Sequence, residues 1–166
     1  MNKSAYFPGY WSDDWPDENW LERFFLTPEG RRDFFSSDND SWGLTINGVD
    51  GTGHLPDLKG RVDVDLTIQA HRDLGILLFY HKKGTGRRVA YYSKGDLSRL
   101  HQCIKTAHDD LMPIGLFIPF ETAWKAIKEF MDRDGALPTC IPWVAENDLP
   151  DGTFPPPQSS VNHARY

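Results

Sequence analysis

The sequence predicts an α+β domain in which an antiparallel β-meander is covered on one face by a C-terminal amphipathic helix and flanked by N-terminal helices. Three observations lead to this prediction. Apolar and polar residues alternate from Val62 to Ala70, as in a strand with one buried face. The next run, Leu74 to Tyr80, is apolar on both faces, as in a central strand. Between Phe120 and Met131 apolar residues recur at steps of three and four, which is the spacing of an α-helix.

Residues 1–60 form the acidic, aromatic-rich N-terminal part of the domain. Asp14 or Asp17 can cap a first helix, because a short side-chain oxygen accepts a hydrogen bond from the first free backbone N–H groups. A second, short helix is expected from Thr27 to Phe35, where Thr-Pro-Glu is a typical helix start. A first strand is expected from Trp42 to Val49, ahead of Asn-Gly and Asp-Gly turns.

Residues 61–143 contain the meander and the amphipathic helix, within the same domain. A third strand at Arg88–Tyr92 follows the two runs described above, and the loops between the three are short. Consecutive antiparallel pairing is therefore expected, since a parallel crossover needs a dozen or more residues. We also predict a helix from Leu97 to Ala107, on the spacing of its apolar residues, and short strands at Leu116–Ile118 and Thr139–Val144.

The amphipathic helix has clear end signals. Pro119 is tolerated at a helix start, and Glu121 suits the positive end of the helix dipole. Gly135 and Pro138 end the helix, since glycine can take a left-handed conformation and proline cannot continue a helix. Residues 144–166 are proline-rich with few apolar residues, so we expect an extended or disordered tail.

The negative charge of the chain is concentrated in its first third. The net charge is −6, and residues 1–60 contain 11 Asp and Glu against 5 Lys and Arg, whereas the remainder contains 13 of each kind. Direct binding to nucleic acid is therefore not expected, because phosphate contacts require clustered Lys and Arg. A basic protein partner is the natural complement.

The N-terminus lacks the apolar segment of a secretory signal, and no run approaches the roughly 20 apolar residues of a membrane helix. We therefore expect a cytoplasmic protein that does not bind membranes. In a reducing compartment, Cys103 and Cys140 are expected as free thiols rather than as a disulfide.

Few residues suggest catalysis or metal binding. His101 and His108 match no zinc motif, and surface histidines are the favoured interpretation. Asp63 and Asp65 lie on one side of their strand and could perform acid–base chemistry or bind Mg²⁺, although the polar face of an amphipathic strand is favoured. No phosphate-binding loop, nucleophile elbow or deaminase signature is present. We expect no enzyme, metal or cofactor; a small hydrolase that uses the two aspartates and a histidine is the minor alternative.

The stretch from Tyr10 to Glu18 combines aromatic side chains with carboxylates, a mixture typical of a surface that binds a basic protein. In the alternative interpretation, the aromatics fold into the core and the carboxylates only solvate the surface. We assign Trp11, Trp15 and the carboxylates to an interface, with the polar side of the first meander strand as a second candidate. The candidate partner-binding residues are Tyr10, Trp11, Asp13, Asp14, Trp15, Asp17, Glu18, Asp63 and Asp65.

The segment from Pro119 to Trp143 carries a further pattern: a helix opened by proline and an acidic residue, an aromatic helix end, a glycine, a proline and a final tryptophan. This order resembles the C-terminal signature of the type 1 immunity proteins of bacterial polymorphic toxin systems. The likeness extends more loosely back to Val62 and does not include residues 1–60. The matching residues are Pro119, Glu121, Ala123, Ala126, Phe130, Gly135, Pro138 and Trp143.

The resemblance implies an immunity protein, a cytoplasmic inhibitor that binds one cognate toxin domain and blocks its active site. Toxins paired with this family are often deaminase-like or nucleases, and the acidic first third would complement the basic cleft of such an enzyme. A regulatory adaptor that uses the same surface for another protein is the alternative. We expect the free protein to be a monomer.

Overall fold

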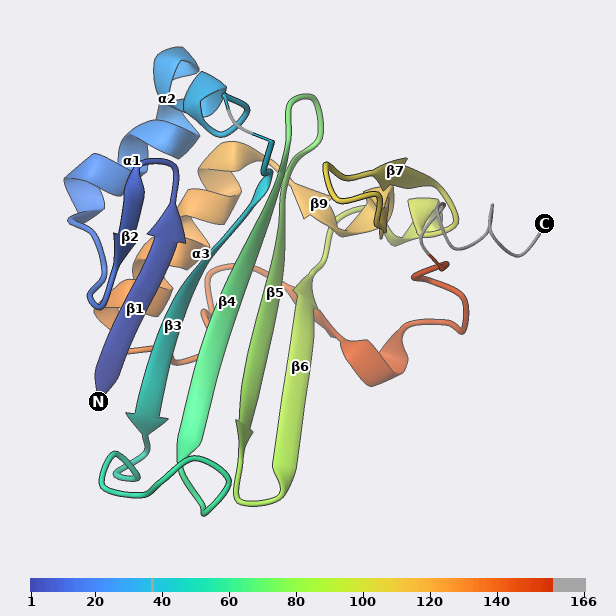
Figure 1. The fold of residues 1–166 in the computed structure, drawn as a ribbon. Helices are drawn as coiled ribbons and strands as arrows, with labels where there is room; N and C mark the ends of the chain where they lie inside the picture. The colour runs from blue at the N-terminus through green and yellow to red at the C-terminus, as the bar shows by residue number, and fades with distance from the viewer. Residues whose placement is uncertain (37, 157–166) are drawn as a thin grey trace, which may run out of the picture.

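The computed structural model describes residues 1–36 and 38–156. They form an α+β fold around an antiparallel sheet of eight strands (Figure 1). Seven of them have the order β10-β6-β5-β4-β3-β1-β2, and the eighth, β9, pairs with β5. A separate two-stranded hairpin is made by β7 and β8. The strands are β1 (Asn2–Phe7), β2 (Tyr10–Ser12), β3 (Ser41–Val49), β4 (Val62–His71), β5 (Gly75–Gly84), β6 (Arg87–Ser93), β7 (Cys103–Lys105), β8 (Leu111–Pro113), β9 (Phe117–Ile118) and β10 (Trp143–Ala145).

The predicted meander is confirmed, because β4, β5 and β6 are consecutive antiparallel neighbours. The alternation in β4 sets its orientation: Val64, Leu66 and Ile68 are buried in the main core, under 2% exposed. β3 pairs with β4 as the strand prediction requires. It is not the first strand, however, because the prediction missed β1 and β2, which extend the sheet beyond β3.

Three helices cover one face of the sheet (Figure 1): α1 (Glu18–Leu26), α2 (Pro28–Asp33) and α3 (Phe120–Asp132). The apolar stripe of α3 faces the core, and Trp124, Ile127 and Phe130 are at most 4% exposed. Thr27 caps α2, as its Oγ1 accepts from the Gly30 amide at 3.0 Å. The predicted starts of α2 and α3 are therefore confirmed, whereas α2 ends at Asp33, two residues earlier than predicted.

Gly135 explains why α3 ends where it does. Its φ is +86°, in the left-handed region that side chains disfavour, and a Cβ there would lie 2.7 Å from Cγ2 of Ile46 in β3. Its carbonyl also accepts a hydrogen bond from the buried hydroxyl of Tyr80, at 2.8 Å. The glycine thus allows the chain to leave the helix while packed closely against the sheet.

The helix predicted at Leu97–Ala107 is wrong. The structure has a single 3₁₀ turn at Leu97–Arg99, capped by Asp96, and then the β7–β8 hairpin. The apolar side chains that suggested a helix, those of Leu97, Leu100 and Ile104, instead pack on a second, smaller core cluster built on β5 and β9. Tertiary packing has overridden the local periodicity here.

The predicted tail begins later than expected. β10 occupies Trp143–Ala145 and pairs with β6, and a 3₁₀ turn follows at Glu146–Asp148. Thr153 is buried, and the ring of Phe154 lies 4.9 Å from that of Tyr92. The remaining tail, residues 157–166, lies outside the described residues.

Candidate partner interface

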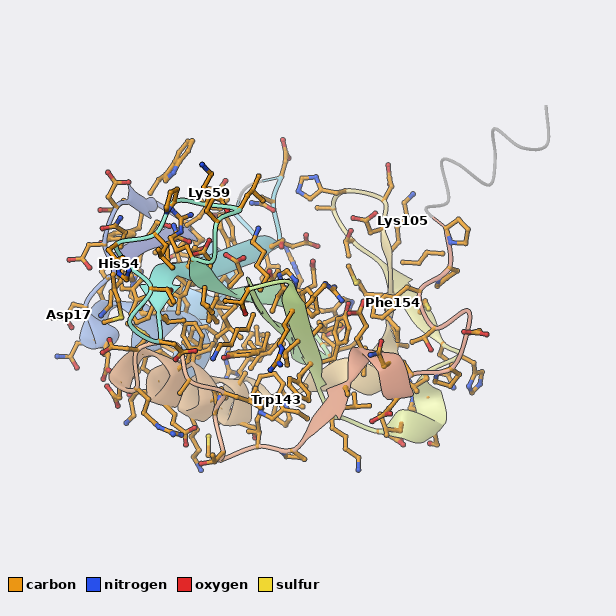
Figure 2. The ribbon with its side chains drawn as sticks, turned by 90° about the horizontal axis from the view of Figure 1, so that it is seen from below. Asp17, His54, Lys59, Lys105, Trp143 and Phe154 are labelled. Carbon is orange, nitrogen blue, oxygen red and sulfur yellow. The ribbon has the colours of Figure 1, made fainter. Side chains whose placement is uncertain are left out.

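The face of the sheet opposite the three helices is here called the open face. Figure 2 shows α3 on one side of the sheet, with Lys59 and Lys105 on the other side. The strand registers place one row of side chains straight across this face, since positions two apart on a strand share a face. In strand order from β2 to β6, the row consists of Trp11, Tyr6, Gly43, Thr67, Phe79 and Tyr92.

Two hollows lie along this row and share Ser41 and Thr67 in their walls. The first, of about 290 Å³, also includes Trp11 and Tyr6. The second, of about 210 Å³, lies beneath the β7–β8 hairpin and includes Phe79, Tyr92 and Phe154. Because they share walls, we treat them as one open-face groove, with small residues at its centre and aromatic rings at both ends.

Trp11 is the most exposed large aromatic side chain in the described part of the chain, at 87%. It belongs to the three-residue edge strand β2, and its ring makes an edge-on contact with Tyr6 at 5.9 Å between centroids. A tryptophan left this open keeps a large apolar surface in water, and such residues dominate the binding energy of protein interfaces. Its position on the open face follows from its pairing with Tyr6.

The sheet edges are poor sites for adding a partner strand. β2 has only three residues, and β10 covers β6 only at Tyr91–Ser93. The uncovered half of β6 carries Arg87 and Arg88, and charged side chains of this kind prevent edge-to-edge pairing. A partner is therefore expected to bind through side chains rather than by adding a strand to the sheet.

A second row across the open face is polar. Asp65 accepts a hydrogen bond from Oγ1 of Thr45 at 2.7 Å and remains half-exposed. His81 lies opposite Asp65 in the register and stacks on Phe79 at 5.8 Å. Burial lowers the pKa of His81, with a further contribution from Arg88, so the fold disfavours a positive charge on this ring. Asp65 thus contributes a negative charge to the face.

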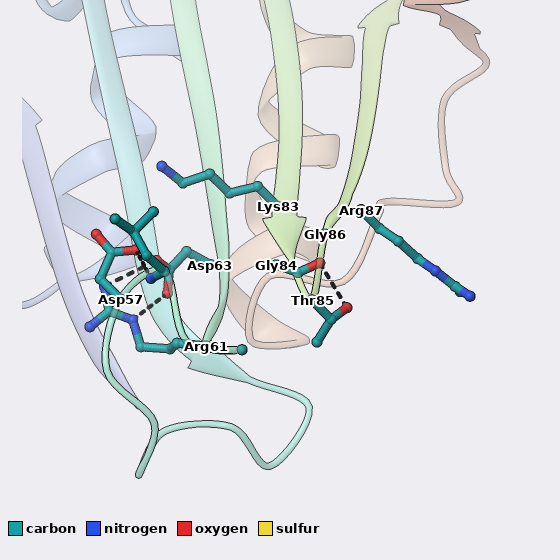
Figure 3. Close-up of a pocket in the computed structure, with 10 residues that line it drawn as sticks. Asp57, Arg61, Asp63, Lys83, Gly84, Thr85, Gly86 and Arg87 are labelled. Atoms are coloured by element: carbon teal, nitrogen blue, oxygen red, sulfur yellow. Dashed lines mark hydrogen bonds and ion pairs between the residues drawn. The ribbon is translucent and has the colours of Figure 1, made fainter.

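Asp63, the other predicted strand carboxylate, is only 4% exposed. It accepts bonds from Nε and Nη2 of Arg61 at 2.9 and 3.1 Å and from the Gly48 amide at 3.1 Å. Figure 3 shows this ion pair in the wall of a hollow of about 320 Å³, with the side chain of Arg87, another lining residue, pointing away from the pair. The carboxylate is fully used inside the fold, so the pair of free aspartates required by the hydrolase alternative does not exist.

The aromatic residues of the acidic stretch divide between surface and core. The ring of Tyr10 lies 5.4 Å from that of Trp20, and its hydroxyl donates to the Asp14 carbonyl. Trp15 is half-buried: its indole N–H donates to the Thr45 carbonyl at 2.9 Å, and its ring lies 5.5 Å from Phe130. Both side chains support the fold, so Trp11 alone is an open aromatic anchor in this stretch.

The carboxylates of the stretch lie near the β2 edge of the sheet and at the start of α1. Asp13 and Asp14 are exposed in the loop after β2. Asp17 is the N-cap of α1 and accepts from the Asn19 amide at 2.7 Å. Glu18, in the first turn, lies against Asp132 near the end of α3. The structure thus leaves two exposed carboxylates near Trp11, of which Asp14 accepts a hydrogen bond from the Trp15 amide at 2.8 Å. Asp17 serves as a helix cap, and Glu18 lies at the contact between α1 and α3.

The Glu18–Asp132 contact predicts a pH dependence of stability. A hydrogen bond from Glu18 to Asp132, together with partial burial, raises the Glu18 pKa to about 7. A carboxyl that binds its proton more tightly in the folded state stabilises the fold at low pH, and this contribution is lost as the pH rises from about 4.5 to about 7. The unfolding free energy of the natural protein should therefore fall more between pH 5 and pH 8 than that of Glu18→Gln. Urea unfolding of both proteins across this range tests the prediction. If the unfolding free energy changes equally with pH in the two proteins, Glu18 and Asp132 share no proton.

Sequence reasoning missed Tyr6, Phe79, Tyr92 and Phe154 in the groove. The sequence of β5 did contain a signal for Phe79, since this run is apolar on both faces. Its second apolar face, with Leu77 and Phe79, points away from the main core. Tyr92 lies in the predicted strand Arg88–Tyr92, but its place in the groove was not predicted. Tyr6 and Phe154 could not be found from local pattern, since β1 was not predicted and Phe154 lies in the predicted tail.

An exposed tryptophan beside carboxylates on an open sheet face is the arrangement of a protein-binding domain. Among residues 1–36 and 38–156, no group of three or more His, Cys, Asp or Glu is placed to hold a metal ion. In the same part of the chain, no helix is long and apolar enough to cross a membrane, and both cysteines are free.

The family model for immunity protein Imm1 matches residues 34–145. The chain therefore belongs to the Imm1 immunity protein family, which confirms the resemblance found around Pro119–Trp143. No curated protein and no solved structure shows a significant match. The match begins at Phe34, so β1, β2, α1 and α2 all precede the family pattern.

Proposed function

We propose that this chain is a cytoplasmic immunity protein that binds one cognate bacterial toxin domain and occludes its active site through the open-face groove and the adjoining β2 edge. We choose this surface because Trp11 is 87% exposed there, and because the chain belongs to the Imm1 family. Immunity requires tight binding to a toxin, and an exposed tryptophan beside a groove with aromatic ends supplies an anchor for it.

The charges near the groove favour a toxin with a basic active-site cleft, such as a deaminase or nuclease that acts on nucleic acid. Asp13 and Asp14 are exposed next to Trp11, and Asp65 lies on β4, three strands across the sheet from β2. An enzyme that holds phosphates needs Lys and Arg in its cleft, and carboxylates placed over the cleft attract it and exclude its substrate.

Trp11, Asp13 and Asp14 precede the segment that the family model describes. Recognition of one toxin among many requires contacts that differ from one immunity protein to the next. Surface residues outside the shared pattern are suited to this task, because they can change without disturbing β3 to β6 and α3. This placement supports the β2 edge as a determinant of cognate specificity.

The test uses the toxin domain encoded beside the gene for this chain. We expect a stable complex on size exclusion, and loss of the toxin's catalytic activity as the immunity protein is titrated to a fixed stoichiometric ratio. Binding without inhibition would favour the adaptor alternative. Absence of any complex with that toxin domain would contradict the proposal.

Charge should determine how fast the complex forms. Changing Asp13, Asp14 and Asp17 to Asn and Glu18 to Gln should slow association at low salt and flatten its salt dependence, because exposed charges steer a basic partner and are screened within about 10 Å at 0.1 M salt. Thermal stability should change little: an Asn at position 17 can still cap α1, and Glu18→Gln removes a carboxyl crowded against Asp132. Stopped-flow association rates across a salt series measure the effect.

A control variant with the same change in net charge separates local steering from overall charge. Four exposed carboxylates elsewhere are suitable for replacement by Asn, namely those of Asp57, Asp73, Asp148 and Asp151. The control should retain a salt dependence close to that of the natural protein. If the two variants behave alike, the acidic stretch is only a solvated surface.

A further inference from the structure

A pocket of about 390 Å³ lies at the end of the molecule where α2, the turn between β4 and β5, and the start of α3 meet, at the top of Figure 1. We call it the arginine pocket. It is separate from the open-face groove, with which it shares no lining residue. Its lining consists of Arg31, Arg32, Phe35, Arg72 and Phe120.

Phenyl rings hold two of the three guanidinium groups. The guanidinium carbon of Arg31 lies 4.4 Å from the ring centre of Phe120, and that of Arg72 lies 5.1 Å from the ring centre of Phe35. Arg31 is fixed further, since its Nε donates to the Phe25 carbonyl and its Nη2 to Glu121, both at 2.7 Å. A guanidinium held over a ring loses less conformational entropy when it binds a ligand, and those of its N–H groups that donate to no protein atom stay available in the guanidinium plane.

The positive charge of the pocket is only partly compensated, because in the described part of the chain Arg31 alone of its three arginines forms an ion pair. Arg32 and Arg72 are exposed, and neither forms an ion pair within the described residues. No acidic residue lines the pocket, although Glu121 pairs with Arg31 beside it. Three arginines thus converge on one cavity of a chain whose net charge is −6.

We propose that the arginine pocket binds a small organic anion, a carboxylate or phosphate carried on a flat apolar group. Guanidinium groups bind both oxyanions through paired N–H···O bonds, which accounts for the charged part of the ligand. Phe35 and Phe120 provide the apolar contact, and the volume is in the range of small-molecule sites. The pocket has the size for one such group, whereas a nucleic-acid surface would need a longer basic track.

Phenyl phosphate and inorganic phosphate are the probes, because they share a headgroup and differ by one ring. In calorimetric titrations of the full chain, we expect saturable binding of phenyl phosphate that is roughly tenfold tighter than that of inorganic phosphate. The double variant Arg32→Gln/Arg72→Gln should weaken phenyl phosphate binding at least about tenfold. The control Arg87→Gln/Arg99→Gln makes the same charge change at exposed positions outside the pocket and should bind like the natural protein.

Several results would overturn the proposal. Absence of saturable phenyl phosphate binding would do so, as would equal affinities for the two probes, which would remove the role of the rings. Equal weakening in the control variant would mean that only net charge matters. If the pocket variant slows association with the toxin while phenyl phosphate does not bind to the natural protein, the pocket is a protein contact and not a small-molecule site. Thermal unfolding of each variant verifies that the fold is kept.

Discussion

Replacing Trp11 with Ala is expected to speed dissociation of the toxin complex about 30-fold or more, with little change in the association rate. A loss of roughly 2 kcal/mol or more is typical of a tryptophan at the centre of an interface, and most mutational changes in affinity appear in the dissociation rate. Trp11 is 87% exposed in the free protein and contacts Tyr6 only edge-on. Its truncation should therefore leave the unfolding midpoint nearly unchanged, and surface plasmon resonance with immobilised toxin measures the two rates separately.

Leu58→Ala is the matched control for this prediction. Leu58 is 97% exposed in the loop between β3 and β4, so its truncation removes a comparable open apolar side chain away from the open-face groove. This control should leave both rate constants within about twofold of those of the natural protein. If Trp11→Ala dissociates no faster than Leu58→Ala, the toxin is bound elsewhere and the open face loses its main support.

The contrast between Trp11 and Trp15 shows how much of the candidate interface could be predicted from the sequence. Both were predicted as anchors, because they sit among the same carboxylates. Their roles separate only through a distant contact, the bond from Trp15 to the Thr45 carbonyl, 30 residues along the chain. Local pattern singled out the segment as a candidate interface, but it could not predict which of its aromatic side chains turns inward.

Asp63 gives the same lesson for the strand face. The alternation of β4 correctly separated its two faces, and Asp63 does lie on the other face of this strand from Val64 and Leu66. Alternation predicts exposure only if nothing covers the polar face. Here Arg61 folds back on Asp63 and the Gly48 amide donates to it, which makes the carboxylate internal. The meander and α3 could therefore be predicted from their strong periodicity. Which side chains of the candidate site are exposed depends instead on contacts between residues far apart in the chain, which periodicity does not show.

The largest expected effect on stability belongs to Trp124→Ala. Trp124 is 4% exposed on α3, and its ring is stacked on that of Phe25 of α1 at 5.4 Å. Truncating a buried tryptophan removes its transfer free energy and leaves a cavity, at a cost of roughly 3–5 kcal/mol. For a chain of this length that corresponds to a fall in the unfolding midpoint of roughly 6–20 °C. Circular dichroism melts measure the shift.

The same experiment tests whether the acidic N-terminal part and the meander form one domain, as we propose. Trp124 joins the two through Phe25, which precedes the segment matched by the family model. In one cooperative domain, the destabilisation should appear as a single transition that moves to lower temperature, with near-ultraviolet and far-ultraviolet signals changing together. Lys125→Ala, at the exposed neighbouring position, should stay within about 0.5 kcal/mol of the natural protein. Two separated transitions in Trp124→Ala would mean that α1 and α2 unfold independently, and the N-terminal part would then be an appended arm on the Imm1 fold.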